Sequence, residues 1–363
     1  MRSLARRLSS QIVQLMLPVL LAMLPASYAL AADSGALSSV VTTGEELWVS
    51  SRVFQQQRRV QVYLPSGYHL SQAQYPVLYL LDGDVYYTAV AGMVRLLSES
   101  SGRIPEMIVV SIPNVARARE LAPPLHNPKP GDEVFAADVF QRFLAEDLIP
   151  WVEARYRTEP FRILVGHSRG GLFALHTLLN SPDTFDAYLA LSPALWWDDE
   201  NILRDAVEKL RALRPGRSQR FLYLAAAHES VEIIRPTARA AKLLRQTRPA
   251  GLQWKHEYLA NENHMSSHLP GTLAGLQWVF AGLQVPDAVI LSQGLAGVEK
   301  HYAALHAQYG FELQPSYAML AWVAGFLDQQ GRASEAQKFL KRANELYPAH
   351  PPLMRDWPAL PLQ

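Results

Sequence analysis

The stretch that decides the fold reads Ile-Leu-Val-Gly-His-Ser-Arg-Gly-Gly-Leu-Phe and occupies residues 163–173. It contains the pattern G-x-S-x-G centred on Ser168. An apolar run at 161–165 precedes the pattern, and a run compatible with a helix follows it at 172–179. A strand, a tight turn and a helix in this order predict a nucleophile elbow, in which the turn strains the serine backbone and exposes the hydroxyl.

Two glycines frame the expected turn. We expect Gly166 and Gly170 to be required because a Cβ at either position would collide with the neighbouring turn. The following helix would direct its N-terminus, and its partial positive charge, at Ser168. The bare motif arises by chance in roughly one chain of this length in ten, so the strand and helix around it carry the prediction.

Composition limits the classes of protein that the chain can belong to. Of 363 residues, 49% are hydrophobic and 18% are charged, so a large core is available. The net charge of +1 gives no indication of a nucleic-acid partner. The sequence has no cysteine, which excludes disulfides, thiolate metal sites and cysteine nucleophiles.

The N-terminus has the pattern of a secretory signal peptide. Three arginines lie within the first seven residues, an apolar run follows at 12–24, and Ala29-Leu30-Ala31 fits a cleavage site. The apolar run is short for a transmembrane helix and is broken by a proline, which favours a signal peptide. An uncleaved N-terminal anchor is the alternative. We expect a signal peptide at 1–31, a periplasmic or secreted protein, and no membrane span once the signal is removed.

Apolar runs alternate with segments of helical period after the signal. This alternation predicts an α/β fold at 32–285, with a mostly parallel sheet, helices on both faces and an active site at the carboxyl ends of the strands. The expected strands are 59–64, 75–81, 106–112, 161–165, 185–191, 220–225 and 253–259, and the expected helices are 134–156, 169–180, 200–213 and 232–247.

Residues 286–348 have a different texture, with helical periodicity and no strand run. Residues 317–348 fit one tetratricopeptide-like helical pair with Gly331 at its turn. A single repeat cannot bury its own apolar face, so we expect it to pack on the main domain or to contact a partner protein. The last residues, 349–363, are rich in proline and are expected to be irregular.

An activated serine needs a base and a carboxylate that orients the base. In α/β-hydrolases the order along the chain is serine, acid, histidine, with the acid and the histidine after late strands. Glu229 follows the strand at 220–225 and is the expected acid, with Glu232 as the alternative. After the strand at 253–259, His264 is the expected base and His268 its alternative.

The same two histidines form an H-x-x-x-H pair that could also bind a metal. No glutamate follows His264, and no third ligand is evident in the sequence. We therefore expect no metal. The oxyanion hole requires two backbone N–H groups, and we expect them from Arg169 and from Asp84, with Gly83 or Val85 as neighbouring candidates.

The chain resembles the "Putative esterase" family of α/β-hydrolases, which includes esterase D and the ferric-enterobactin esterases. The resemblance covers residues 45–283 and implies a carboxylic-ester hydrolase with Ser168 as nucleophile and no cofactor. The stretches that carry it are Tyr79 to Gly83, Ile112 to Asn114 with Arg117 to Pro123, Gly166 to Leu175, Ser192 to Trp197, and Gly271 to Phe280. Some relatives also resemble the chain in having a repeat-like helical tail.

Several positions near the motifs have two interpretations. Trp196 and Trp197 follow a strand end, and we expect them to form a wall of the substrate cleft rather than plain core. Arg119 is an expected substrate-binding residue, although Arg117 and Arg119 could instead form structural ion pairs. The Arg169 side chain either faces solvent or faces an anionic substrate.

We therefore predict a serine hydrolase that cleaves small carboxylic esters through an acyl-enzyme, with siderophore, aryl or acyl esters as substrates. Ser168, His264 and Glu229 are its expected catalytic residues. The same acyl-enzyme would also permit acyl transfer to an alcohol. A non-catalytic binding protein on a hydrolase scaffold is the alternative from another class.

Overall fold

The computed structural model describes residues 42–348. The expected signal peptide at 1–31 and the expected irregular tail at 349–363 lie outside the described residues. No helix within residues 42–348 is both long and apolar enough to cross a membrane.

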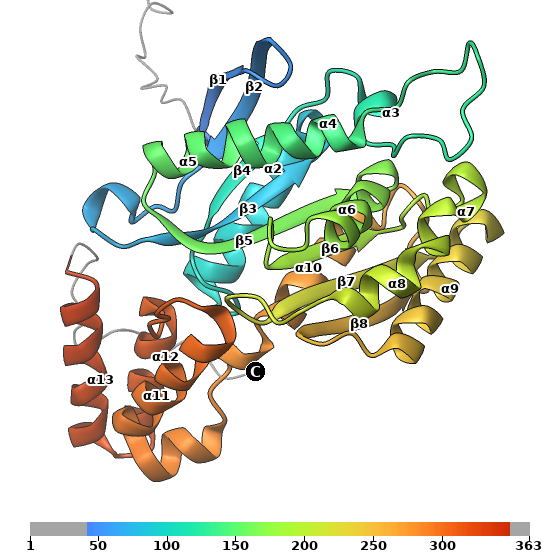
Figure 1. Ribbon diagram of the computed structural model, residues 1–363. Helices are drawn as coiled ribbons and strands as arrows, with labels where there is room; N and C mark the ends of the chain where they lie inside the picture. Colours follow the sequence, from blue (N-terminus) through green and yellow to red (C-terminus); the bar gives the residue numbers. More distant parts are fainter. Residues whose placement is uncertain (1–41, 349–363) are drawn as a thin grey trace, which may run out of the picture. The chain divides into compact units, whose positions relative to one another are not determined.

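One sheet of eight strands organises the described residues, with the strand order β1-β2-β4-β3-β5-β6-β7-β8 (Figure 1). β1 pairs antiparallel with β2, and β2 pairs antiparallel with β4, whereas all other pairings are parallel. The strands are β1 (Glu45–Ser51), β2 (Gln56–Tyr63), β3 (Tyr75–Leu81), β4 (Ile108–Ile112), β5 (Thr158–His167), β6 (Ala187–Leu191), β7 (Arg220–Ala227) and β8 (Leu252–Leu259).

The central parallel strands β3 and β6 are continuous apolar runs because both faces of this part of the sheet are covered. All residues of β3, Tyr-Pro-Val-Leu-Tyr-Leu-Leu, are buried, and so are all residues of β6. The sequence does not predict β1. Its residues, Glu-Glu-Leu-Trp-Val-Ser-Ser, form neither a continuous apolar run nor a strict alternation, because β1 is a largely exposed edge strand.

Helices connect the strands along the chain. They are α2 (Gly83–Arg95), α3 (Arg117–Glu120), α4 (Ala137–Arg142), α5 (Ile149–Arg155), α6 (Arg169–Asn180), α7 (Trp197–Arg204), α8 (Ala206–Ala212), α9 (Val231–Thr247), α10 (His268–Val279), α11 (Asp287–Tyr309), α12 (Tyr317–Gln329) and α13 (Ala333–Leu346), with the shorter turns η1 (Tyr68–Leu70), η2 (Leu96–Ser100), η3 (Phe143–Leu148) and η4 (Ala281–Leu283). The helix expected at 134–156 is the stretch of α4, η3 and α5, and the helix expected at 200–213 is divided into α7 and α8.

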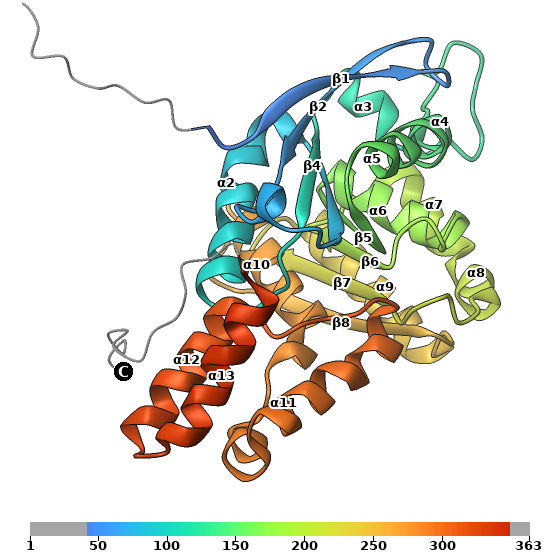
Figure 2. The same ribbon diagram turned by 90° about the vertical axis from the view of Figure 1, so that its left-hand side faces the viewer.

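Each face of the sheet carries its own hydrophobic core. One core packs the sheet against α4, α5, α6, α8 and α9. The other core packs the opposite face against α2, α10 and the C-terminal helices (Figure 2). The expected fold class, a mostly parallel sheet with helices on both faces, is confirmed.

The helices after residue 286 pack on this second core. The Tyr309 ring at the end of α11 lies 5.9 Å from the ring of Phe221 and 5.3 Å from that of Phe280, and its hydroxyl donates to the Val279 carbonyl oxygen at 2.8 Å. Gly331 has a φ of +73° in the turn between α12 and α13. Six apolar residues of α12 and α13 are all buried, namely Leu320, Val323, Leu327, Ala336, Leu340 and Ala343. The domain boundary at 285 and the tetratricopeptide-like character remain predictions.

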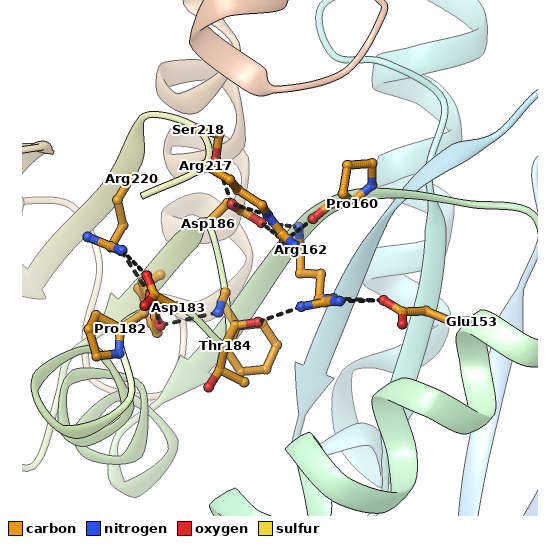
Figure 3. A network of polar contacts seen from close by, with 12 residues as sticks. Glu153, Pro160, Arg162, Pro182, Asp183, Thr184, Asp186, Arg217, Ser218 and Arg220 are labelled. Atoms are coloured by element: carbon orange, nitrogen blue, oxygen red, sulfur yellow. Dashed lines mark hydrogen bonds and ion pairs between the residues drawn. The ribbon is translucent and has the colours of Figure 1, made fainter. Parts of the chain in front are cut away.

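A network of ion pairs lies where β5, β6 and β7 begin (Figure 3). Asp186, the residue before β6, accepts hydrogen bonds from the Arg162 main-chain N–H at 2.9 Å and from Ser218 Oγ at 2.6 Å. Arg217 Nη2 donates to the same carboxylate at 2.8 Å. The other pairs of the network are Arg162 with Glu153 and Arg220 with Asp183.

Candidate active site

Ser168 lies between the end of β5 and the start of α6. Its φ of 58° and ψ of −115° fall outside the regions that a residue with a side chain normally adopts. The turn is held by main-chain hydrogen bonds, from Ser168 N to the Leu191 oxygen at 2.9 Å and from Leu172 N and Ala194 N to the Ser168 oxygen at 3.0 and 2.9 Å. The local structure is therefore the strained strand–turn–helix that the motif predicts.

The glycine requirement of this turn differs from the sequence prediction. A Cβ on Gly166 would lie 2.2 Å from the Gly170 carbonyl oxygen, so glycine is required there. The prediction for Gly170 is wrong, because a Cβ on Gly170 would meet the Asp82 and Leu81 side chains at 3.5 Å, an ordinary contact distance. The third glycine is tighter, since a Cβ on Gly171 would lie 2.9 Å from the Leu191 carbonyl oxygen.

The structure brings Ser168, His264 and Glu229 together. His264 Nε2 lies 3.1 Å from Ser168 Oγ, and His264 Nδ1 lies 2.5 Å from Glu229 Oε2. Glu229 follows β7 and His264 follows β8, so the parallel sheet places both loops at the carboxyl edge beside the elbow. The three side chains form one continuous hydrogen-bonded series.

The Glu229 carboxylate is buried and charged. Its side chain is only 2% exposed, and Oε1 accepts a hydrogen bond from the Ala227 N–H at 2.8 Å. Burial raises the pKa of Glu229, but the hydrogen bonds with His264 and with the Ala227 N–H outweigh burial, so the pKa is lowered. The alternative acid, Glu232, is an exposed residue in the first turn of α9.

His268 occupies a different environment from His264. It begins α10, is 1% exposed and stacks on the Tyr86 ring with centroids 3.5 Å apart. Neither of its ring nitrogens has a hydrogen-bond partner within the described residues. Burial, and then the neighbouring His167, lowers the pKa of His268 to about 3. No cluster of three or more metal-ligating side chains occurs within the part of the chain that the structure describes.

The turn before α2 supplies the second candidate for an oxyanion donor. Asp82 has a φ of 56°, and a Cβ on Gly83 would lie 2.2 Å from Ser111 Oγ, so the chain turns there in a tight space. The Val85 N–H donates to the Asp82 carbonyl oxygen at 3.0 Å, which commits this donor to the turn. Asp84 and Gly83 remain as candidates, together with the Arg169 N–H at the start of α6.

The two arginines of the 117–123 stretch have different surroundings. Arg117 pairs with Asp82 through two hydrogen bonds, from Nε at 2.5 Å and from Nη2 at 2.9 Å. Asn114 Nδ2 donates to the same carboxylate at 2.8 Å. Arg119 is exposed, and its side chain has no hydrogen bond or ion pair among residues 42–348. The structural ion pair therefore involves Arg117, and substrate contact by Arg119 remains a prediction.

The two tryptophans also differ. Trp196 is 43% exposed. Trp197 is half-buried, donates from Nε1 to the Pro123 carbonyl oxygen at 3.1 Å, and lies 4.8 Å below the guanidinium of Arg169. Arg169 also donates to the Ala118 carbonyl oxygen at 2.9 Å, and burial lowers its pKa. A half-buried cation on an aromatic face thus lies directly after the elbow serine.

Sequence reasoning missed the residues that support this site. Asp82 and Asn114 lie in the matching stretches, but no local signal indicates that they share one arginine. A cavity of about 680 Å³ is lined by η2 and the C-terminal helices and does not include Ser168.

An α/β sheet that holds a serine, a histidine and a carboxylate in one hydrogen-bonded series at its carboxyl edge is the arrangement found in serine hydrolases. Residues 51–268 match the family model described as "Putative esterase". Since this match covers more than half of the chain, the protein belongs to the "Putative esterase" family.

Two curated relatives resemble part of the chain. The chain is 36% identical over 150 residues to the ferri-bacillibactin esterase BesA of Bacillus subtilis, and this match covers 36% of this chain and 52% of that protein. The chain is 35% identical over 150 residues to a siderophore enterobactin esterase of Emericella nidulans, and this match covers 36% of this chain and 49% of that protein. The chain spans about half the length of these curated relatives.

A solved structure resembles more of the chain. An IroE-like serine hydrolase from Shewanella oneidensis has a TM-score of 0.71 at 27% identity, covering 84% of this chain and 99% of that chain. The similarity therefore extends over most of this chain.

Proposed function

We propose that the protein is a serine esterase that hydrolyses small carboxylic esters through an acyl-enzyme. The observation that carries this proposal is the hydrogen-bonded series from Ser168 through His264 to Glu229, with distances of 3.1 and 2.5 Å. Membership of an esterase family supports the same class of reaction.

In the proposed reaction, Ser168 Oγ attacks the ester carbonyl carbon while His264 Nε2 accepts the hydroxyl proton. Glu229 accepts the hydrogen bond of His264 Nδ1–H and stabilises the imidazolium that forms. The main-chain N–H groups of Arg169 and Asp84 are the proposed donors to the developing oxyanion. His264 then returns the proton to the leaving alcohol, and a water molecule activated in the same way releases the acid.

We assign the substrate class as esters with an aryl-containing, siderophore-type acyl group. Two features of the chain support this class: the half-buried Arg169 guanidinium on the Trp197 ring, and the exposed ring of Trp196 next to it. A cation beside aromatic surface suits an anionic aryl group. The names of the curated relatives, which are siderophore esterases, favour the same class.

The test is a steady-state and burst experiment with the purified protein. A p-nitrophenyl ester should release p-nitrophenol in a burst equal to the enzyme concentration, and a panel of siderophore, aryl, sugar-acetyl and acyl-glycerol esters should identify the preferred acyl group. Absence of turnover on every ester, with no labelling of Ser168 by a fluorophosphonate, would indicate a binding protein. Preferential transfer to an added alcohol would indicate an acyltransferase.

We also propose that residues 1–31 direct export and are removed, so that the enzyme acts in the periplasm or outside the cell. The intact mass of protein recovered from the periplasmic fraction should correspond to a chain that begins at residue 32. A mass that includes Met1 in membrane fractions would identify an uncleaved anchor instead.

We propose that residues 286–348 form a helical segment that contacts a partner protein. Trp322 on α12 is 45% exposed and stacks on Phe326, which supports a contact surface there. Deletion from Gln314 onward keeps Tyr309 in the core and should leave kcat/KM on a small ester unchanged. A changed preference for bulky esters would show that the segment acts as a lid, and loss of activity in folded protein would place it within the active site.

A further inference from the structure

The side chain of His167, the residue before the elbow serine, contacts the loop that carries the catalytic histidine. Its Nε2 lies 2.7 Å from the main-chain oxygen of His264, and the two imidazole rings are 4.7 Å apart. A carbonyl oxygen can only accept a hydrogen bond, so His167 Nε2 carries the proton and donates it. The strand β5, which ends in His167, is thereby bonded directly to the backbone of His264.

The same carbonyl oxygen has a second donor. Ser267 Oγ lies 3.0 Å from the His264 oxygen and also 3.0 Å from Ser192 Oγ, the residue directly after β6. Ser267 is 1% exposed, so this bond is shielded from water. The main chain of His264 is therefore fixed from the carboxyl ends of two neighbouring strands, β5 and β6.

The main chain of His167 is also bonded to the candidate oxyanion turn. Arg117 Nη2 donates to the His167 carbonyl oxygen at 3.3 Å, and the same guanidinium pairs with Asp82 at 2.5 and 2.9 Å. Asp82 directly precedes the Gly83 and Asp84 N–H groups. His167 thus lies at the junction of the elbow, the oxyanion turn and the histidine loop.

His167 makes these contacts as a neutral group. It is 3% exposed, and burial, followed by the effect of His264, lowers its pKa to about 4. The centroids of the Tyr86 and His268 rings lie 6.3 and 5.8 Å from that of His167. Arg117, which is paired with Asp82, donates to the His167 main-chain oxygen. A neutral donor can hold the His264 backbone without placing a positive charge beside the imidazolium that forms during the reaction.

We infer that His167 is a positioning residue, which fixes the backbone of His264 so that its imidazole reaches Ser168 and Glu229 together. This inference rests on the proposed function and assigns His167 a part in the same reaction. In this role His167 acts through the backbone of His264 rather than on the substrate.

His268 provides a matched control for this role. It is a buried, neutral imidazole in contact with His167, but neither of its nitrogens forms a hydrogen bond within the described residues. If burial of an imidazole were all that mattered, the same substitution at the two positions would have the same effect. If the hydrogen bond matters, only His167 should affect the reaction.

The experiment compares His167→Leu, His167→Gln and His268→Leu in the purified mature protein. The measurements are kcat and KM on a p-nitrophenyl ester and the rate of Ser168 labelling by a fluorophosphonate. A small misplacement of a catalytic group can cost up to about 100-fold in rate. His167→Leu should therefore lower kcat and the labelling rate by about 10- to 100-fold with little change in KM.

The two comparison variants should behave differently. His167→Gln should restore most of the rate because its amide Nε2 reaches the position of the ring nitrogen. His268→Leu should lower the melting temperature but leave kcat close to that of the wild type. Should His167→Leu not fold, His167→Asn replaces it, since its shorter amide cannot reach the His264 oxygen while the Gln variant can.

Three results would overturn the inference: near wild-type kcat in folded His167→Leu, an equal loss of kcat in His268→Leu, or no difference between Gln and the variants that lack the donor. A wild-type protein that neither hydrolyses esters nor labels at Ser168 would instead overturn the proposed function, and this inference with it. The two failures are therefore distinguishable by the wild-type control.

Discussion

The two edges of the parallel sheet contain similar polar residues in opposite situations. At the amino edge, Asp186 is surrounded by donors from Arg162, Arg217 and Ser218, and the network is complete within the protein (Figure 3). At the carboxyl edge, the series from Glu229 to His264 is complete, but it ends at the half-buried hydroxyl of Ser168.

The backbone at the carboxyl edge is also strained. Ser168 and Asp82, both at the carboxyl edge, have positive φ values of 58° and 56°. Strain of this kind persists only where the surrounding structure holds it, and it is concentrated at functional sites. A buried charge with every hydrogen bond satisfied internally is structural, whereas a hydrogen-bonded series that ends at an accessible atom is available for chemistry. Substitutions at the two edges should therefore affect different quantities.

The largest effect is expected at the end of the carboxyl-edge series. Ser168→Ala should lower kcat by about 10⁴- to 10⁶-fold, because the hydroxyl is the attacking atom. The melting temperature should hardly change, since the hydroxyl contributes little to packing. Steady-state kinetics and thermal unfolding check the two quantities separately. A variant that keeps a tenth of the wild-type turnover would contradict the proposed mechanism.

His264→Ala should be nearly as damaging as Ser168→Ala. The double variant should be scarcely slower than either single variant, because residues that act as one unit have non-additive effects on rate. The check is kcat for the two single variants and the double variant under one set of conditions. Full additivity, or an inactive His268→Ala beside an active His264→Ala, would show that the base is assigned to the wrong residue.

Substitution of the acid, Glu229, should lower kcat less than substitution of the base, His264. Glu229→Gln should lower kcat by up to about 10⁴-fold, because the neutral amide no longer holds the required tautomer of His264. Glu232→Gln is the matched control, since Glu232 is an exposed carboxylate three residues further along the chain. Equal and small losses in the two variants would favour a serine–histidine dyad.

At the amino edge the expected effect is on stability alone. Asp186→Ala should lower the free energy of unfolding by about 1–3 kcal/mol, because it leaves donors such as the Arg162 N–H without an acceptor. Urea denaturation measures this loss, and kcat should stay unchanged. Arg142→Ala, which removes an exposed ion pair with Glu146, should alter neither quantity measurably. A large loss of kcat in folded Asp186→Ala would contradict the claim that the amino edge affects stability alone.

Much of the fold could be predicted from the sequence because its signals are local. The apolar runs of β3 and β6 and the helix at 169–180 depend on neighbouring residues in the chain, and the structure contains them close to the expected bounds. β1 gives no such signal, because an edge strand is exposed and carries mixed residues. The helix α2 was also missed, and its two glycines and two adjacent tyrosines show why.

The candidate site was partly predictable for the same reason. The elbow around Ser168 is a local motif, and the order of strands along the chain limits the acid and the base to two loops. The catalytic roles remain predictions, but the structure brings together the residues that the sequence favoured. The requirement for Gly170 was wrong because it depends on which neighbours face the glycine, and these are the side chains of Leu81 at the end of β3 and of Asp82 directly after it.

Local sequence signals were thus enough to predict the class of fold, the elbow and the two loops in which the partners of Ser168 had to lie. Three contacts became visible only in the folded chain: Glu229 rather than Glu232 faces His264, Arg117 pairs with Asp82, and His167 bonds to the histidine loop. The physical reason is distance along the chain. These contacts join residues 35 to 97 positions apart, and their geometry exists only after the sheet has packed the ends of its strands side by side.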